Sequence, residues 1–202
     1  FMDIIEKNSR ETLKKQYNID PDCPIITLFP GSRTQEVNKH LKIFINAANL
    51  LKENIKDLQI IIGLHPKFNS KIIQKFDPGL IIINDFPLRA LEMADIAIIA
   101  SGTATLQALL LGTPGIIVYK MNSLSWLLTK CFVKIKYAGI VNILANKIIY
   151  PELLQNQATP QKIYQTINSL LQDDTQKQSL NKEIISLQQS IGKEGASAKA
   201  DE

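Results

Sequence analysis

Residues 25–33 read IITLFPGSR, an almost entirely apolar run that ends in small and polar residues. The run predicts a buried β-strand over residues 25–29, because apolar side chains at successive positions face both sides of a sheet. Pro30 and Gly31 predict that the strand ends there. Apolar residues at helical spacing then predict a helix over residues 38–54. The fold therefore begins with a strand, a tight loop and a helix.

The same alternation continues along the chain. Further apolar runs lie at residues 58–64, 80–83, 96–100 and 115–119, and helical patterns lie between them at 67–75, 87–93 and 104–111. Runs that are apolar on both faces and separated by helices are typical of parallel strands covered on both sides. The sequence therefore predicts an α/β fold, with a doubly wound parallel sheet of five or more strands.

Beyond residue 120 the pattern becomes helical. Helices are predicted at 124–133, 160–171 and from Asp174 to about Ile191, with a loop containing residues 138–142 between the first two. Residues 196–202 have the composition of a new helix without an apolar face. We expect this C-terminal part to add extra helices to the sheet.

Composition limits the function classes. The 202 residues are 45% hydrophobic and 21% charged, as in ordinary globular proteins. The net charge of +4 is spread along the chain, which argues against a nucleic-acid partner. Two histidines exclude a His-rich metal site, and the distant Cys23 and Cys131 fit a reducing compartment. No apolar run is long enough to span a membrane.

Two loops leave predicted strand ends with small and polar residues. Residues 30–33 (PGSR) follow the first strand, and residues 101–105 (SGTAT) follow the fourth. In open α/β sheets, ligands bind beyond the carboxyl ends of the strands, where the strand order reverses. If the order is third, second, first, fourth, fifth, the first and fourth strands are neighbours. Both loops then face one crevice.

The residue types in these loops suit a phosphate-bearing ligand. Gly31 and Gly102 allow a close backbone approach, and Ser101 and Thr103 add hydroxyl donors. Arg33 adds a planar, permanently charged donor. The alternative is a tight turn with a helix cap, and an arginine that is merely solvated. Neither a Walker A motif nor GxGxxG is present, which disfavours an NTPase or a dinucleotide dehydrogenase.

Five segments in order resemble the lipid-A-disaccharide synthase family. They are residues 28–33 with Glu36 (LFPGSR…E), 100–106 (ASGTATL), 118–120 (VYK), 141–145 (VNILA) and 151–155 (PELLQ). Together they span about residues 25–160, and their combination is specific. The SGTATL segment alone also suits other two-domain glycosyltransferases and related sugar-nucleotide epimerases.

The resemblance implies a GT-B glycosyltransferase, with this chain as its donor-binding half. The family transfers 2,3-diacylglucosamine from UDP-2,3-diacylglucosamine to 2,3-diacylglucosamine 1-phosphate, inverting the anomeric carbon to form a β-1,6 link and releasing UDP. Residues 1–20 would be an inter-domain helix or linker remnant, 21–160 the Rossmann-like donor domain, and 161–202 C-terminal helices truncated at the end. Without the N-terminal half, which holds the acceptor groove and the general base, the chain alone is expected to be inactive.

The resemblance also implies the partners. They are the UDP-sugar donor, the N-terminal acceptor domain, the lipid acceptor and the inner-membrane surface, which would place the complete enzyme peripherally on the cytoplasmic face. A homodimer is left open, and no nucleic acid is expected. No cofactor or metal is implied, because no DxD motif is placed to bind a diphosphate-bound cation.

Site residues follow from the same resemblance. Arg33 would neutralise charge on the leaving diphosphate. The expected donor site is Gly31, Ser32, Arg33, Asn84, Asp85, Ser101, Gly102, Thr103, Gln107, Asn142, Glu152 and Gln155. Glu36 could instead pair with Arg33 or cap the helix that follows. Asn84 and Asp85 lie where related enzymes hold uracil through backbone atoms, and His65 is expected to be an ordinary loop residue rather than a catalytic one.

Three positions depart from the family pattern. Gln107 replaces a glutamate that accepts hydrogen bonds from ribose hydroxyls in related enzymes, so the charge-assisted bond is lost, a difference of roughly 1 kcal/mol. Val141 replaces a proline and Asn146 replaces a glycine around Asn142, and both changes are expected to loosen that loop. The helix at 124–133, apolar with a lysine flank, would be an interfacial element, or else core packing or a dimer contact.

Two other functions remain open from the sequence. The chain could be the donor half of another GT-B enzyme or epimerase that uses UDP-N-acetylglucosamine. It could also be a non-catalytic nucleotide-binding domain derived from such an enzyme.

Overall fold

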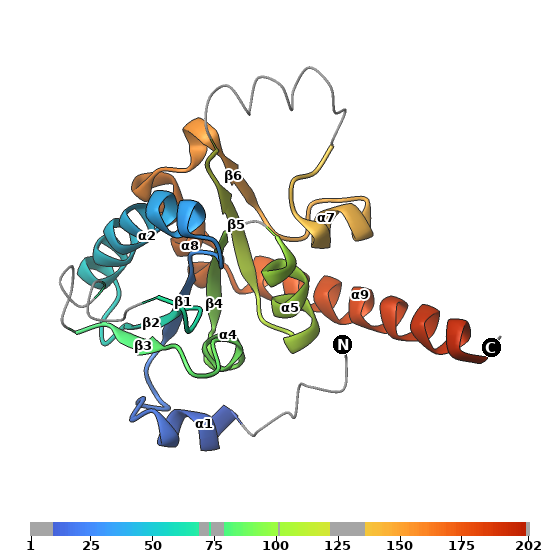
Figure 1. Cartoon of the computed structure of the whole chain (residues 1–202), viewed down its shortest axis with the longest axis horizontal. Helices are drawn as coiled ribbons and strands as arrows, with labels where there is room; N and C mark the ends of the chain where they lie inside the picture. Colours follow the sequence, from blue (N-terminus) through green and yellow to red (C-terminus); the bar gives the residue numbers. More distant parts are fainter. Residues whose placement is uncertain (1–9, 69–72, 74–78, 101, 122–135, 201–202) are drawn as a thin grey trace.

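A six-stranded parallel sheet forms the centre of the computed structural model, which describes residues 10–68, 73, 79–100, 102–121 and 136–200 (Figure 1). The strands are β1 (Ile25–Phe29), β2 (Gln59–Gly63), β3 (Ile81–Ile83), β4 (Ile96–Ala100), β5 (Gly115–Tyr119) and β6 (Glu152–Leu154), in the order β3-β2-β1-β4-β5-β6. The doubly wound α/β fold is as predicted, and the order of the first five strands is the one that the sequence analysis assumed. The strand order reverses between β1 and β4, which are paired neighbours.

Helices cover both faces of this sheet. They are α1 (Arg10–Gln16), α2 (Thr34–Asn54), α4 (Leu88–Met93), α5 (Thr103–Leu111), α7 (Ile140–Ala145), α8 (Pro160–Gln172) and α9 (Asp174–Ala200), with a 3-10 turn η1 (Gln155–Gln157). Helices α2 and α8 pack together on one face, whereas α1, α4 and α5 lie on the other (Figure 1). None of the described helices combines the length and the apolarity that a membrane crossing requires.

Burial on both faces explains why the strands read as continuous apolar runs. Ile26 and Leu28 of β1 point into the large core shared with α2 and α8. Ile25 points the other way, into a smaller cluster with Leu13 of α1 and Met93 of α4. Thr27 faces the same side, and its hydroxyl donates to Ala90 O at 2.6 Å. The segment predicted as a linker remnant thus contributes Leu13, which is fully buried, to the core.

The structure corrects four boundaries. Helix α2 begins at Thr34, four residues earlier than predicted, because Glu36 caps its N-terminus. Residues 140–142, expected in a loop, belong to α7. Residues 152–154 form a sixth strand through pairing with β5. Helix α9 continues to Ala200, so no new helix begins at residue 196.

Asn146 ends α7 in the left-handed conformation, at φ 49°. Asparagine tolerates this conformation better than most residues, because its short polar side chain forms local hydrogen bonds. Asn146 therefore ends the helix as the family's glycine would.

The predicted helix at 124–133, together with Cys131, lies outside the described residues, as does most of the one at 67–75.

Candidate functional site

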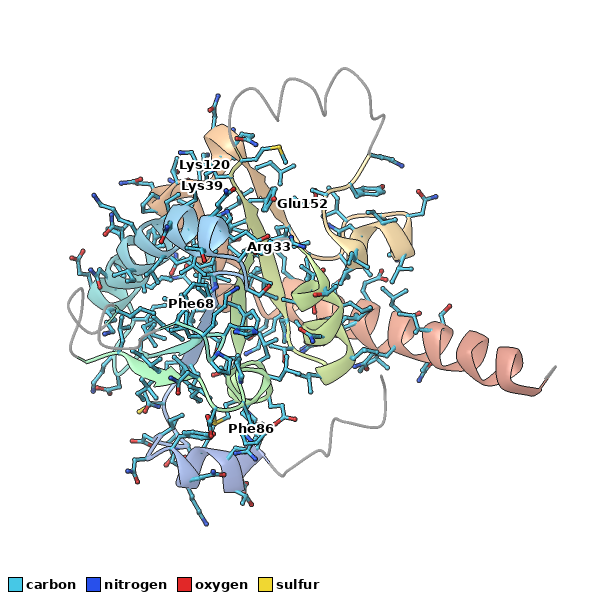
Figure 2. The ribbon with its side chains drawn as sticks, in the orientation of Figure 1. Arg33, Lys39, Phe68, Phe86, Lys120 and Glu152 are labelled. Carbon is cyan, nitrogen blue, oxygen red and sulfur yellow. The ribbon has the colours of Figure 1, made fainter. Side chains whose placement is uncertain are left out.

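The edge of the sheet where β1 and β4 end is the expected position of the crevice, and the name is kept for this edge below. Phe29 pairs with Ile99 in the sheet, so the loops that follow the two strands leave the same edge side by side. Figure 2 shows Arg33 near the centre of the view, with Lys120 and Glu152 toward one end of the row of strands and Phe86 toward the other. Ser101, predicted to donate to a phosphate, lies outside the described residues.

Gly31 and Glu36 shape the loop after β1. Gly31 has φ +110°, and a Cβ placed there would lie 2.7 Å from Glu36 Oε2 and 2.9 Å from Glu36 Cβ. That carboxylate oxygen accepts from the backbone N–H groups of Ser32 at 3.3 Å and Arg33 at 3.2 Å. Glu36 therefore caps α2 and fixes the loop in the same contact. Its other oxygen forms an ion pair with Arg33. Glu36 therefore has both of the roles expected of it apart from a ligand contact, as a helix cap and as a partner of Arg33.

Arg33 is an exposed cation at the crevice. Its side chain is 82% exposed, and its only ion pair among the described residues joins Nη1 to Glu36 Oε1 at 3.1 Å. Guanidinium has five N–H donors in a fixed fork, so most of its donors remain available. Because an exposed ion pair contributes little stability, the guanidinium can turn toward an anion at small cost.

Gly102 and Thr103 begin α5 on the other side of the crevice. Gly102 has φ +135°, and a Cβ built on it meets no atom within 4 Å, so the position faces open space. It has no side chain to cap the helix, and no acidic residue lies in the first turn. The N–H of Thr105 donates to Gly102 O at 3.1 Å, whereas those of Thr103 and Ala104 have no partner among the described residues and are open to an anion. Thr103 is exposed, and Gln107 lies one turn further on the same helical face.

Asn142 and Glu152 are occupied by contacts within the protein. Asn142 is fully buried; its Oδ1 accepts from the N–H groups of Ile149 and Tyr150, at 2.8 and 2.9 Å. Its Nδ2 donates to Tyr150 O at 2.7 Å and to Glu152 Oε1 at 2.8 Å, which uses every position of the amide. Glu152 also accepts from the N–H of Gly139 at 2.9 Å. The pair builds the turn between α7 and β6.

Gln155 and Asp85 also have partners in the fold. In the orientation that its neighbours favour, the Gln155 amide donates to Met121 O at 3.3 Å and accepts from Met121 N–H at 3.2 Å. This contact joins the ends of β5 and β6. Asp85 accepts from the Tyr17 hydroxyl at 3.1 Å and so connects the loop after β3 to the turn that follows α1. Asn84, beside it, is half-buried.

His40 is the residue of this region that the sequence reasoning missed. It is fully buried on α2, and its Nε2 accepts from the backbone N–H of Lys120 at 3.0 Å. The imidazole lies between the rings of Phe44 and Tyr119, with centroids 5.8 and 5.6 Å away. Burial lowers the pKa of His40. The only signal in the sequence was a polar residue on an otherwise apolar helix face.

The charges at this edge favour an anion. Arg33 and Lys120 are exposed. The nearby carboxylates of Glu36, Asp85 and Glu152 each accept hydrogen bonds from the protein. No three His, Cys, Asp or Glu side chains of the described residues gather where a metal ion could bind.

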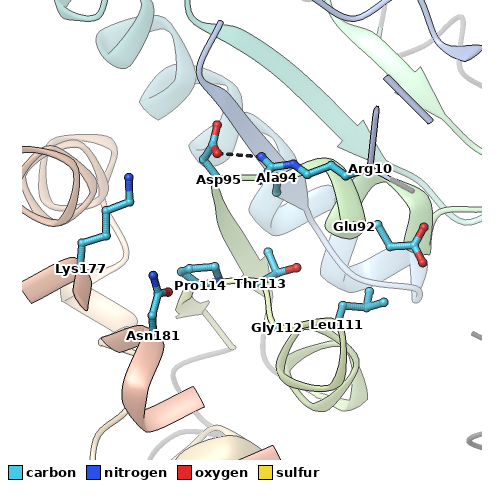
Figure 3. Close-up of a pocket in the computed structure, with 10 residues that line it drawn as sticks. All are labelled: Arg10, Glu92, Ala94, Asp95, Leu111, Gly112, Thr113, Pro114, Lys177 and Asn181. Carbon is cyan, nitrogen blue, oxygen red and sulfur yellow. Dashed lines mark hydrogen bonds and ion pairs between the residues drawn. The ribbon is translucent and has the colours of Figure 1, made fainter. Parts of the chain in front are cut away.

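A cavity of about 480 Å³ lies at the opposite edge of the sheet, where β4 and β5 begin (Figure 3). Its lining carries charges of both signs, including Arg10, Glu92 and Lys177. Arg10 is held there by Asp95 at 2.7 Å. No predicted site residue lines this cavity, so it is distinct from the crevice.

Comparison with known sequences gives one family. The family model described as lipid-A-disaccharide synthetase matches residues 1–201. A lipid-A-disaccharide synthase of Syntrophus aciditrophicus is 32% identical, over 99% of this chain and 54% of that protein. One of Coxiella burnetii is 36% identical, over 85% of this chain and 46% of that protein. The chain thus spans about half the length of the curated relatives it matches.

Solved structures share the fold. A spinosyn rhamnosyltransferase complexed with thymidine diphosphate has a TM-score of 0.58 at 15% identity, over 84% of this chain and 42% of that one. A UDP-GlcNAc 2-epimerase from Neisseria meningitidis, bound to UDP-GlcNAc, has a TM-score of 0.53 at 15% identity, over 87% of this chain and 43% of that one. At these identities the likeness concerns the fold alone. It confirms the expected doubly wound α/β domain.

Proposed function

The chain belongs to the lipid-A-disaccharide synthetase family, and from that premise we propose that it is the part of the glycosyltransferase that binds the nucleotide-sugar donor. The observation that carries this proposal is the pairing of β1 with β4. It brings the exposed Arg33 guanidinium and the uncapped start of α5 to one crevice. A cation and a row of open N–H groups together suit a diphosphate.

The donor is UDP-2,3-diacylglucosamine and the acceptor 2,3-diacylglucosamine 1-phosphate, as in the family. The bond between the anomeric carbon and the diphosphate oxygen breaks, and a bond to the acceptor hydroxyl forms with inversion. Negative charge then develops on the departing UDP. Arg33 and the first N–H groups of α5 stabilise that charge, because donors that are already oriented need no rearrangement during the reaction.

The predicted site residues divide into two groups in this proposal. Gly31, Ser32, Arg33, Gly102 and Thr103 face the diphosphate, with Ser101 between β4 and α5. Gln107 lies toward the ribose, and Asn84 and Asp85 toward the base. Asn142, Glu152 and Gln155 act through the loops they hold, since their side chains bond within the protein.

Donor binding, rather than turnover, is the activity proposed for these 202 residues by themselves. A proton must leave the acceptor hydroxyl, which requires a positioned base. The chain spans about half the length of its relatives, and we assign the base and the acceptor groove to the other half. The two lipid substrates would hold the complete enzyme at the cytoplasmic face of the inner membrane.

Calorimetric titration of the chain with UDP tests the proposal. The chain should bind UDP, and Arg33→Ala should weaken binding about 10- to 150-fold, the range for hydrogen bonds to a charged group. Lys42→Ala removes the same charge from an exposed position on α2 and should bind UDP like the original chain. Uridine, which lacks the diphosphate, should bind the original chain and the Arg33→Ala variant with equal affinity. A folded chain that does not bind UDP contradicts the proposal.

A further inference from the structure

One partly buried hydrogen bond connects α2 to the chain that leaves β5. His40 lies on α2, the helix that follows the loop at residues 30–33. Its acceptor contact is the backbone N–H of Lys120, the first residue after β5. These residues are 80 positions apart in the sequence. The bond therefore fixes where the chain leaves β5 relative to α2.

The contact defines the chemical state of the imidazole. Because Nε2 accepts a hydrogen bond, the proton of the neutral ring must be on Nδ1. Nδ1 makes no hydrogen bond of good geometry, although the carbonyls of Pro30 and Glu36 lie close enough to act on the ring. Pro30 begins the loop that contains Arg33. The ring thus lies between the loop after β1 and the segment after β5.

Packing alone does not require a histidine here. The neighbouring core positions of α2 are apolar, among them Val37, Leu41 and Phe44. A buried polar ring is unfavourable unless its hydrogen bonds are made, and here one nitrogen has only weak partners. A leucine would fill such a site without that cost. What a leucine could not do is hold the backbone N–H of Lys120.

The hydrogen bond to His40 positions Lys120. Its backbone is fixed by His40, whereas its side chain is exposed at the carboxyl end of β5. Strand β5 pairs with β4, whose carboxyl end leads into the start of α5. No acidic side chain of the described residues forms an ion pair with the Lys120 ammonium. A diphosphate carries more charge than one guanidinium neutralises, so a second cation beside Arg33 suits it.

We propose that His40 is a positioning residue of the donor site, which holds Lys120 so that its ammonium contacts the diphosphate. This inference rests on the proposed function and extends it to two residues. The bond needs neutral His40, since a protonated imidazole has no acceptor. The groups facing the ring are Glu36 and Lys39 from α2, Tyr119 and the Lys120 N–H from the end of β5, and the carbonyl of Pro30.

Titration of the whole chain with UDP separates positioning from packing. His40→Leu keeps the volume and removes the acceptor, and it should weaken UDP binding about 2- to 12-fold, the range for loss of a neutral hydrogen bond. His40→Gln places an amide oxygen where Nε2 lies and should restore most of the affinity. Lys120→Ala should weaken binding to a similar extent. The His40→Leu/Lys120→Ala double variant should be no weaker than Lys120→Ala alone.

Two controls match these changes. Leu51→Ala opens a cavity in the buried face of α2 far along the helix, so it should lower thermal stability without changing UDP affinity. Lys42→Ala removes a lysine from the exposed face of the same helix and should also leave the affinity unchanged. If Leu51→Ala weakens UDP binding as much as His40→Leu does, a general loss of stability explains both and the inference is wrong.

The outcomes distinguish this inference from the proposed function. If the original chain binds UDP and His40→Leu binds it equally well, the positioning role is wrong and the proposed function stands. A folded original chain that does not bind UDP overturns both. The nitrogen resonances of the His40 imidazole give a test without any variant. A ring that is neutral with its proton on Nδ1 supports the inference, and a protonated Nε2 overturns it.

Discussion

Asn142 Nδ2 donates to Glu152 Oε1 at 2.8 Å, so two residues that the family pattern assigns to the donor bind each other instead. Asn142 lies on α7 and Glu152 begins β6. With their remaining bonds to the backbone, they hold the chain between these elements in one conformation. In the proposed function, their part is therefore to fix the edge of the site beside β5.

Asn142→Ala should destabilise the fold more than it affects the ligand. The change leaves the N–H groups of Ile149 and Tyr150 without an acceptor in the core, at about 1–3 kcal/mol for each unsatisfied group. Urea unfolding measures this loss. Asn146→Ala, at the exposed end of α7, should lower the unfolding free energy by about 1 kcal/mol, the cost of a left-handed residue. Equal losses for the two variants would contradict the buried role of Asn142.

Gly31→Ala should mainly lower the stability of the fold, whereas Gly102→Ala should mainly lower the affinity for UDP. Both residues have positive φ, which strains alanine by roughly 1–3 kcal/mol. At Gly31 the new methyl group also collides with Glu36, so the cap of α2 should be displaced and the unfolding free energy should fall further. At Gly102 the methyl group enters open space, where it should obstruct a bound diphosphate. We therefore expect Gly31→Ala to lose more stability, and Gly102→Ala to lose UDP affinity even at temperatures where it is fully folded.

The pH dependence of stability should contain a contribution from His40. Burial lowers its pKa in the folded chain, so below the ordinary value of about 6.5 the unfolded chain takes up the proton first. The stabilisation from neutral His40 is fully present above about pH 6.5 and is lost as the pH falls from that value toward the lower pKa of the folded chain. Urea unfolding between pH 5 and 8 measures the slope, which His40→Gln should reduce. His65→Gln, at an exposed histidine, is the matched control and should retain the slope of the original chain.

Gln107→Glu should strengthen nucleotide binding through the ribose. It restores the carboxylate of the family pattern, on the same face of α5 as Thr103. A charged acceptor in place of a neutral one should gain roughly 1 kcal/mol, or about fivefold in UDP affinity. UDP that lacks both ribose hydroxyls should bind the original chain and the variant alike. A gain that persists with that ligand would mean that the side chain at position 107 acts elsewhere.

The order of elements could be predicted from the sequence because each depends on local pattern. A strand buried on both faces must be apolar at successive positions, and runs such as residues 96–100 show this directly. The small residues after β1 and β4 likewise marked the loops that meet at the crevice. β6 was missed because it is three residues long and belongs to the sheet only through its pairing with β5.

The sequence by itself determined the fold class, the family and the position of the two loops proposed to face a phosphate, since each of these depends on residues that are close together in the chain. Only the tertiary structure decided which polar residues face the crevice. Asn142 is buried against Glu152, and His40 bonds a backbone group 80 residues away. A hydrogen bond between distant segments has no periodicity in the sequence, because it exists only once the sheet has brought its two partners together.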